Sequence, residues 1–145
     1  MSVLDAQALI AFLTDEPAMP LVEALLRDED DQAGIGAANL AECADVLVRV
    51  KRVPEDEVER TLGLVLESLP VLPVDAAIAL LAGRIRARRY KAPERAISLS
   101  DCLALATAVV RGERLASSDP ALLRTAAEEG CAVVPLPDQR GVVPQ

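Results

Sequence analysis

The hydrophobic and polar residues of this chain follow two patterns, which together predict short strands alternating with helices. Short apolar runs that end at Pro, Gly or a charged residue are typical of buried strands, and apolar residues three and four positions apart are typical of helices. The pattern predicts strands over residues 2–4, 32–38, 71–74, 115–118 and 131–136. It predicts helices over residues 5–14, 21–27, 39–52, 55–69, 75–89, 99–110 and 119–129. Strands that alternate with helices in this way indicate an open α/β sheet with parallel strands.

One predicted helix, residues 99–110, is apolar on nearly every side. Between residues 102 and 110 the only polar side chain is Thr107, so the pattern predicts a buried helix. Asp101 lies at the start of this segment. A buried carboxylate is costly unless another group neutralises it or a function requires it, which makes Asp101 a candidate functional residue.

The composition is that of one folded domain. A chain of 145 residues is long enough to bury a substantial core, and its 52% hydrophobic content includes only one Phe, one Tyr and no Trp. A core of Leu, Val, Ile and Ala suits helices packed on a parallel sheet. We expect residues 1–137 to form the domain and residues 138–145 to be a weakly ordered tail, because this end of the chain is polar and contains Gly141.

Charge and rare residue types exclude several classes of function. The chain has no histidine, which excludes His-based triads and His metal sites. Its three cysteines are scattered in apolar runs, and we expect reduced core residues rather than zinc ligands or disulfides. The net charge of −8 argues against a broad basic surface for nucleic acid. We recognise no leader and no spanning segment, so we expect a soluble cytoplasmic protein that contacts no membrane.

Four carboxylates are expected to meet at one edge of the sheet. Asp5, Glu42 and Asp119 each come shortly after a predicted strand, and the carboxyl ends of parallel strands lie at one edge. The helix that contains Asp101 must return the chain to the start of the next strand, so it also begins at this edge.

Each carboxylate has a simpler explanation as part of a helix cap. The alternatives are N-caps at Asp5 and at Asp119, and capping boxes at Asn39–Glu42 and Ser98–Asp101. Capping explains each position alone, but it does not explain why all four lie at the same edge. Carboxylates that lie close together repel one another and need cations, and oxygen ligands favour Mg²⁺ or Mn²⁺. Two such ions can activate a water and stabilise the leaving oxygen of a phosphodiester.

Four stretches of the chain resemble the PIN-domain family, in particular its VapC-like ribonuclease toxins. They are LDAQALIAFL at the N-terminus, NLAECADVL around Glu42, ISLSDCLALATA around Asp101 and LASSDPALL around Asp119. The resemblance implies a single-domain Rossmann-like α/β sandwich, with a short-stranded parallel sheet flanked by helices. It also implies Mg²⁺- or Mn²⁺-dependent cleavage of single-stranded RNA, a homodimer, and a cognate antitoxin that covers the acidic crevice.

The resemblance also assigns roles to individual residues. The family's acidic catalytic and metal-binding positions are matched by Asp5, Glu42, Asp101 and Asp119. Ser117 matches a small hydroxyl residue that assists them. Asn39 stands where the family often has Ser or Thr, and Ala6 and Gln7 stand where it often has Thr and Ser. The supporting contacts are therefore expected to differ from those of the family.

Six of the fifteen basic residues fall in one twelve-residue stretch. They are Arg84, Arg86, Arg88, Arg89, Lys91 and Arg95. Against the acidic background of the chain, this stretch is the local candidate for contact with an RNA backbone. The alternative is a solvated helix face with cations favourably placed near its C-terminus. Tyr90 is expected to pack against apolar neighbours rather than to stack on a base.

The sequence leaves three functions to compare. The first is a metal-dependent endoribonuclease, acting as the toxin of a toxin–antitoxin pair or as a housekeeping RNA-processing nuclease. The second is a catalytically silent PIN-like module that binds RNA or protein. The third is a phosphatase with an aspartyl nucleophile, which is disfavoured because Gln7 stands where such a mechanism requires a second Asp.

Overall fold

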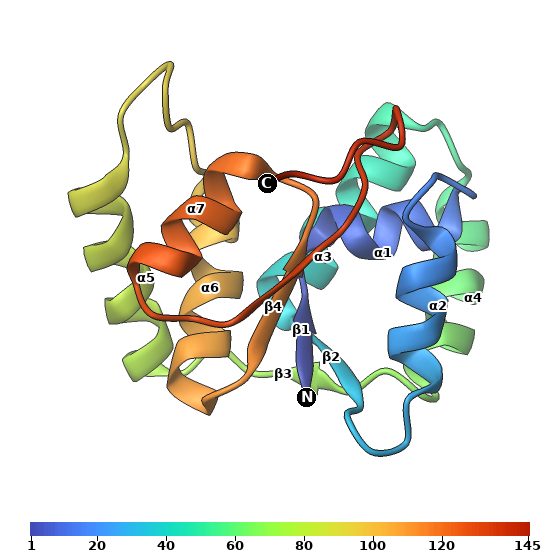
Figure 1. Cartoon of the computed structure of the whole chain (residues 1–145). Helices are drawn as coiled ribbons and strands as arrows, with labels where there is room; N and C mark the ends of the chain where they lie inside the picture. Colours follow the sequence, from blue (N-terminus) through green and yellow to red (C-terminus); the bar gives the residue numbers. More distant parts are fainter.

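The computed structural model describes residues 1–145 and shows a five-stranded sheet with the strand order β3-β2-β1-β4-β5 (Figure 1). The strands are β1 (Ser2–Leu4), β2 (Ala33–Gly36), β3 (Val71–Leu72), β4 (Arg114–Ser117) and β5 (Val133–Pro135). Every pairing between neighbouring strands is parallel, and in the central one Val3 of β1 lies opposite Leu115 of β4. The α/β class expected from the alternating pattern is confirmed.

Helices cover both faces of this sheet (Figure 1). They are α1 (Ala6–Leu13), α2 (Met19–Arg27), α3 (Ala37–Asp45), a short π-helix (Val46–Val50), α4 (Glu55–Leu66), α5 (Ala76–Arg89), α6 (Leu99–Arg111) and α7 (Pro120–Glu128). Val3 of β1 packs into a core formed with α5, α6 and α7, whereas Leu4 packs into a second core formed with α1 to α4. Because successive side chains of a strand point to opposite faces, β1 contributes to both cores at once.

The apolar segment at residues 99–110 forms α6, as predicted. Its middle is buried, and the hydroxyl of Thr107 donates to the carbonyl of Leu103 at 2.7 Å, so the one buried polar group there is satisfied. At the two ends, Leu99 and Val110 are exposed, so burial on every side holds only for the middle of the helix. The helix ends at Gly112, whose φ of 66° is left-handed and favours glycine.

β1 and β4 are neighbours at the point where the chain changes its direction across the sheet. From β1 the chain adds β2 and β3 toward one edge, and it then adds β4 and β5 toward the other. In open α/β sheets, ligands bind in the crevice beyond the carboxyl ends of the strands at such a switch point. The residues that follow β1 and β4 therefore occupy the expected place for a functional site.

The region after β2 differs from the prediction. The strand ends at Gly36 and α3 begins at Ala37, two residues earlier than expected. Asn39 therefore lies inside the helix, and the predicted capping box of Asn39 and Glu42 is wrong. Two alanines at the start of α3 favour helix over strand, and Gly36 leaves room for the turn, because a Cβ there would come within 3.1 Å of Asn39 Oδ1.

Several predicted elements end earlier than expected. The helix predicted over residues 39–52 ends as a π-helix at Val50, because Arg52 adopts a positive φ of 61° before Pro54 is reached. Likewise α4 ends at Leu66, and β3 has two residues rather than four. Prolines at positions 70 and 73 flank β3 and cannot donate a backbone hydrogen bond, which limits the length of this strand.

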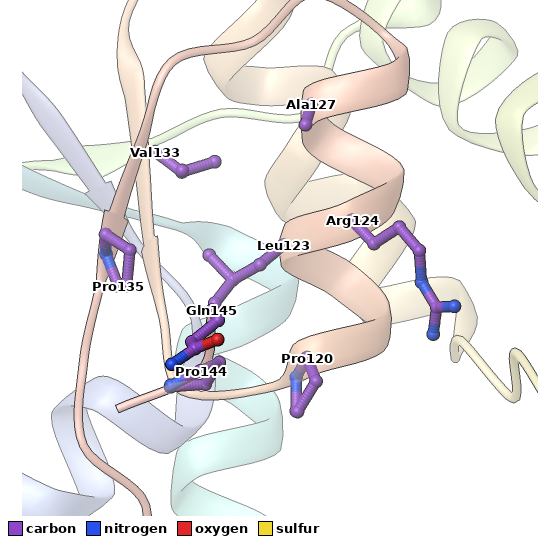
Figure 2. A pocket seen from close by; sticks show the side chains of 8 residues that line it. All are labelled: Pro120, Leu123, Arg124, Ala127, Val133, Pro135, Pro144 and Gln145. Atoms are coloured by element: carbon purple, nitrogen blue, oxygen red, sulfur yellow. The ribbon is translucent and has the colours of Figure 1, made fainter. Parts of the chain in front are cut away.

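The last residues of the chain fold back onto α7. Asp138 closes a turn by accepting the N–H of Val142 at 2.9 Å. Pro144 and Gln145 then lie beside the first turns of α7 and help to line a hollow there (Figure 2). These residues form no helix or strand. The division of the chain after residue 137 remains a prediction.

Two further features concern the cysteines and the possibility of a membrane-spanning helix. All three cysteines are buried and unpaired, as predicted. No helix is long and apolar enough to cross a membrane.

Candidate functional site

Asp5 and Asp119 lie at the switch point, where each begins a helix. Asp5 follows β1 directly, is 2% exposed, and accepts the Ala8 N–H through Oδ1 at 2.7 Å. Asp119 lies two residues after β4 and accepts the N–H groups of Ala121 at 2.7 Å and Leu122 at 3.3 Å, also through Oδ1. Both are therefore N-caps. Capping does not compete with a functional role, because each carboxylate uses only one oxygen for its helix.

Ser117, the last residue of β4, is fully buried between these two acids. Its Oγ accepts the Asp119 N–H at 3.0 Å, and a hydrogen bond from the same hydroxyl acts to lower the pKa of Asp5. A hydroxyl can make both contacts because it donates one proton and accepts through its lone pairs. Ser117 therefore contacts both acids, which supports the assisting role assigned to it.

Asp101 and Glu42 are both held by the start of α6. Ser98 and Asp101 form the predicted capping box: Ser98 Oγ accepts the Asp101 N–H at 3.0 Å, and Asp101 Oδ2 accepts the Ser98 N–H at 2.8 Å. Ser100 Oγ donates to Glu42 Oε2 at 2.8 Å and lies 3.0 Å from Ser98 Oγ. Two hydroxyls thus connect Glu42 on α3 with the cap of Asp101 on α6.

Sequence reasoning did not single out Ser100. The available signal was the spacing of the serines in SLSD, residues 98–101, which places two hydroxyls just before the acid. The role of Ser100 can be recognised only once α3 is known to pack against α6, because its partner Glu42 is 58 residues away.

Burial and charge repulsion perturb Asp5 strongly. Burial raises the pKa of this carboxyl to about 7. Hydrogen bonds from Ser117 and Ala8 oppose the rise, and the charges of Asp101 and Asp119 add to it. These charges act on Asp5 across the carboxyl edge of the sheet, so Asp101 and Asp119 lie on the same side of the sheet as Asp5.

Asp101 links this group to the fourth acid. Burial raises the pKa of Asp101, the capping hydrogen bonds of Ser98 oppose the rise, and the charges of Asp119 and Glu42 add to it. The four carboxylates therefore gather at one edge of the sheet.

None of these four carboxylates is paired with a cation. The acidic residues that do form ion pairs are Glu16, Glu23, Asp31, Asp45, Asp56, Glu113, Glu128, Glu129 and Asp138. As the side chains stand, no three Asp, Glu or Cys residues form a ready-made metal cluster. Asp5, Asp101 and Asp119 each accept a backbone N–H at a helix start. Glu42 accepts the hydroxyl of Ser100. The set of oxygen donors without a basic partner nevertheless fits a divalent cation such as Mg²⁺ or Mn²⁺.

Asn39 lies one turn before Glu42 on α3. It is 1% exposed, and its Nδ2 donates to the carbonyl of Ser100 at 3.1 Å, so it ties α3 to the start of α6. Its Oδ1 is buried and has no hydrogen-bond partner. An unpaired buried acceptor costs about 1–3 kcal/mol. The amide oxygen of Asn39 is thus an oxygen atom without a partner at the start of α3, close to Gly36.

Three arginines of the basic stretch are tied to the end of α7. The N···O distances are 2.6 Å for Arg95–Glu128, 2.9 Å for Arg89–Glu129 and 3.1 Å for Arg88–Glu129. Contacts within the chain therefore account for part of this basic stretch. Arg84 and Lys91 form no such pair, and contact of the stretch with RNA remains a prediction.

Tyr90 does not pack against apolar neighbours as expected. Its side chain is 45% exposed, and the guanidinium of Arg86 lies 4.4 Å from the centre of its ring. Arg86 also donates to the carbonyl of Ile97 at 3.1 Å. A cation over a ring face is a favourable contact, and it holds the start of the loop that leads to α6.

An open parallel sheet with a buried aspartate after β1 and a second aspartate after β4 defines a Rossmann-like α/β protein with a candidate metal-binding edge. Residues 2–128 match the model of the PIN domain. The chain therefore belongs to the PIN-domain family, as the four acidic stretches predicted. A search among curated proteins found no match.

Several solved structures share this fold. VapBC2 from Rickettsia felis, bound to a DNA fragment from its promoter, is 14% identical with a TM-score of 0.71, over 92% of this chain and 96% of that one. FitAcB from Neisseria gonorrhoeae is 22% identical with a TM-score of 0.66, over the same shares of the two chains. VapC20 from Mycobacterium tuberculosis, a toxin that cleaves the sarcin–ricin loop, is 16% identical with a TM-score of 0.63, over 79% of this chain and 87% of that one. At these identities the likeness establishes the PIN fold.

Proposed function

We propose that this chain is a divalent-metal-dependent endoribonuclease that cleaves single-stranded RNA as the toxin of a toxin–antitoxin pair. The observation that carries the proposal is the gathering of four carboxylates, one of them 2% exposed, at the switch point without a basic partner. Burying the Asp5 carboxylate without a compensating cation is costly, and a structural core does not require it. Membership of the PIN-domain family supports the same conclusion.

Asp5, Glu42, Asp101 and Asp119 would hold the metal, with Mg²⁺ or Mn²⁺ as the fitting ions. When bound, the metal would supply the charge needed to activate a water and to stabilise the leaving oxygen of a phosphodiester. Ser117 orients Asp5 and Asp119 through its hydroxyl. The rigid, buried body of α6 keeps Asp101 at the edge of the sheet.

The partners follow from the same proposal. Among the proteins of similar fold are VapBC and FitAB complexes, and one further structure is a toxin–antitoxin complex from Klebsiella pneumoniae. We extend this to the present chain as a cognate antitoxin that covers the acidic crevice, with a homodimer as the active form and the cytoplasm as its location.

RNA cleavage with an Asp101→Asn variant tests the proposal. Asparagine keeps an oxygen for the Ser98 N–H, so the cap and the fold are preserved, but it removes a metal-binding charge. We expect the wild-type protein to cleave a labelled single-stranded RNA in Mg²⁺ or Mn²⁺ and not in EDTA, and the variant to lose this activity. Glu57→Gln, an exposed change on α4, is the matched control and should be fully active. Full activity of Asp101→Asn would refute the mechanism.

One observation favours the silent binding module as a second candidate: no three acids stand ready to hold a metal. Calorimetric titration with Mn²⁺ separates the two functions. A wild-type protein that takes up no Mn²⁺ and cleaves no RNA, while still binding RNA or a protein partner, would establish the silent module instead.

Replacing Ser100 by alanine is expected to reduce cleavage by about tenfold, because groups that only orient a metal ligand typically contribute this much. The variant removes the hydrogen bond to Glu42 and leaves all four acids in place. The cleavage rate measured against Mn²⁺ concentration should show weaker activation by the metal, and Ser100→Thr should restore part of it. Ser68→Ala, which removes an exposed hydroxyl, is the control. An unchanged Mn²⁺ dependence in Ser100→Ala would show that this hydroxyl does not position Glu42.

A further inference from the structure

A basic hollow opens where the end of α5, the loop after it and α7 meet. Its volume is about 440 Å³, and it is lined by Arg88, Arg89, Tyr90, Lys91, Glu94, Arg95 and Arg124. Five of these seven residues are positively charged, in a chain whose net charge is −8. The hollow is therefore a local reversal of the overall charge.

The cations of this hollow fall into two groups. Arg88, Arg89 and Arg95 are held in place by Glu128 and Glu129 at the end of α7. Pairing of this kind fixes a guanidinium before a ligand arrives, so less side-chain freedom is lost on binding.

Lys91 and Arg124 form the second group, because neither makes an ion pair and both are exposed. Figure 2 shows Arg124 projecting from α7 on the side away from Val133 and Pro135. The hollow thus combines three cations held by ion pairs with two that form no ion pair.

The hollow and the candidate site are built on the same two segments, α7 and the chain that leads into α6. Asp119 caps the start of α7, and Arg124 lies on the same helix five residues later, about 7.5 Å along the helix axis. The loop that contains Lys91 leads directly into the start of α6, where Asp101 lies (Figure 1). A polymer that passes the four acids can therefore reach the hollow.

We propose that this hollow binds a phosphate group of the RNA strand beyond the scissile bond, with Lys91 and Arg124 as its direct contacts. The inference rests on the proposed function. A chain with eight excess negative charges repels RNA in general, so binding requires a place where cations outnumber acids. The five cations of the hollow face three carboxylates, those of Glu94, Glu128 and Glu129.

Binding of a fluorescein-labelled single-stranded RNA to the Lys91→Ala/Arg124→Ala double variant tests this site. Both proteins also carry Asp101→Asn, so that the RNA is not cleaved during the measurement. We expect affinity to fall about tenfold and the slope of log affinity against log salt to decrease by about 0.7, because each phosphate neutralised in a single strand contributes roughly 0.7 to that slope. Arg27→Ala/Arg60→Ala is the matched control: it removes the same charge from exposed positions on α2 and α4 and should leave the slope unchanged.

The outcomes separate this inference from the proposed function. If the wild-type protein cleaves RNA and the double variant binds it with an unchanged salt slope, the phosphate site is wrong and the nuclease stands. If Arg27→Ala/Arg60→Ala reduces the slope equally, the effect is one of total charge and the site is wrong. If the double variant binds RNA as before but no longer binds polyglutamate, used as a probe for an acidic protein, the hollow binds an acidic protein instead and the RNA phosphate site is wrong. A wild-type protein that neither binds nor cleaves RNA would overturn both proposals.

Discussion

Replacing Asp5 by asparagine is expected to abolish RNA cleavage and, at the same time, to make the metal-free protein more stable at pH 8. Asp5 is the most buried of the four acids. Under the proposed function it is a metal ligand, so its loss should reduce cleavage by more than the roughly 10- to 100-fold effect of groups that only orient ligands. Asparagine retains an oxygen for the Ala8 N–H, so the cap of α1 survives. Activity and stability therefore change in opposite directions.

The sign of the stability effect follows from the pKa of Asp5, which burial raises from 3.8 to about 7 in the folded state. Below pH 4 the carboxyl is protonated in both states and costs nothing. Between pH 4 and pH 7 the unfolded state ionises this carboxyl while the folded state keeps it protonated, so the free energy of unfolding falls by on the order of 4 kcal/mol and levels off above pH 7. In EDTA, the melting temperature of Asp5→Asn should exceed that of the wild type by up to about 10 °C at pH 8, and by much less at pH 4.

A matched control separates this charge effect from capping. Asp75 caps α5 through the same geometry, accepting the Ile78 N–H at 2.9 Å, but it is exposed. Asp75→Asn should therefore change the melting temperature little and equally at both pH values. A gain in Asp5→Asn that is the same at pH 4 and pH 8 would contradict the burial of an ionisable group as its cause.

Replacing Leu105 by alanine is expected to lower the free energy of unfolding by about 3 kcal/mol, because the removed side chain leaves a cavity in a packed core. Leu105 is completely buried in the middle of α6, in the core shared with α5 and α7. For a chain of this size the melting temperature should fall by about 10 °C, as measured by circular dichroism. Leu64→Ala on α4 removes the same atoms from a side chain that is 69% exposed, and it should have an effect close to zero. Equal effects of the two changes would mean that α6 is not packed as described.

The features that local patterns determine could be predicted from the sequence. Hydrophobic periodicity gave the order of strands and helices, and this order placed Asp5 and Asp119 beyond the central strands. The capping box of Ser98 and Asp101 was also recognisable, because it depends on residues three positions apart. In these cases the information lies within a few residues of the feature itself.

The features that depend on contacts between distant elements could not be predicted. The hydrogen bond from Ser100 to Glu42 requires the packing of α3 against α6. The ion pair of Arg88 with Glu129 joins residues 41 positions apart. The start of α3 at Ala37 was missed for another reason, since a short run of small residues suits both a strand and a helix.

The helices that begin at the candidate site offset part of the negative charge of its acids. Three helices, α1, α6 and α7, begin at Asp5, at Ser98 and at Asp119, so their N-termini all point toward the acids. Each N-terminus of a helix macrodipole is equivalent to roughly half a positive charge, and together they offset roughly one and a half of the four negative charges. The acids can therefore stay together without a metal, and a cation that binds there under the proposed function would find the backbone already in place.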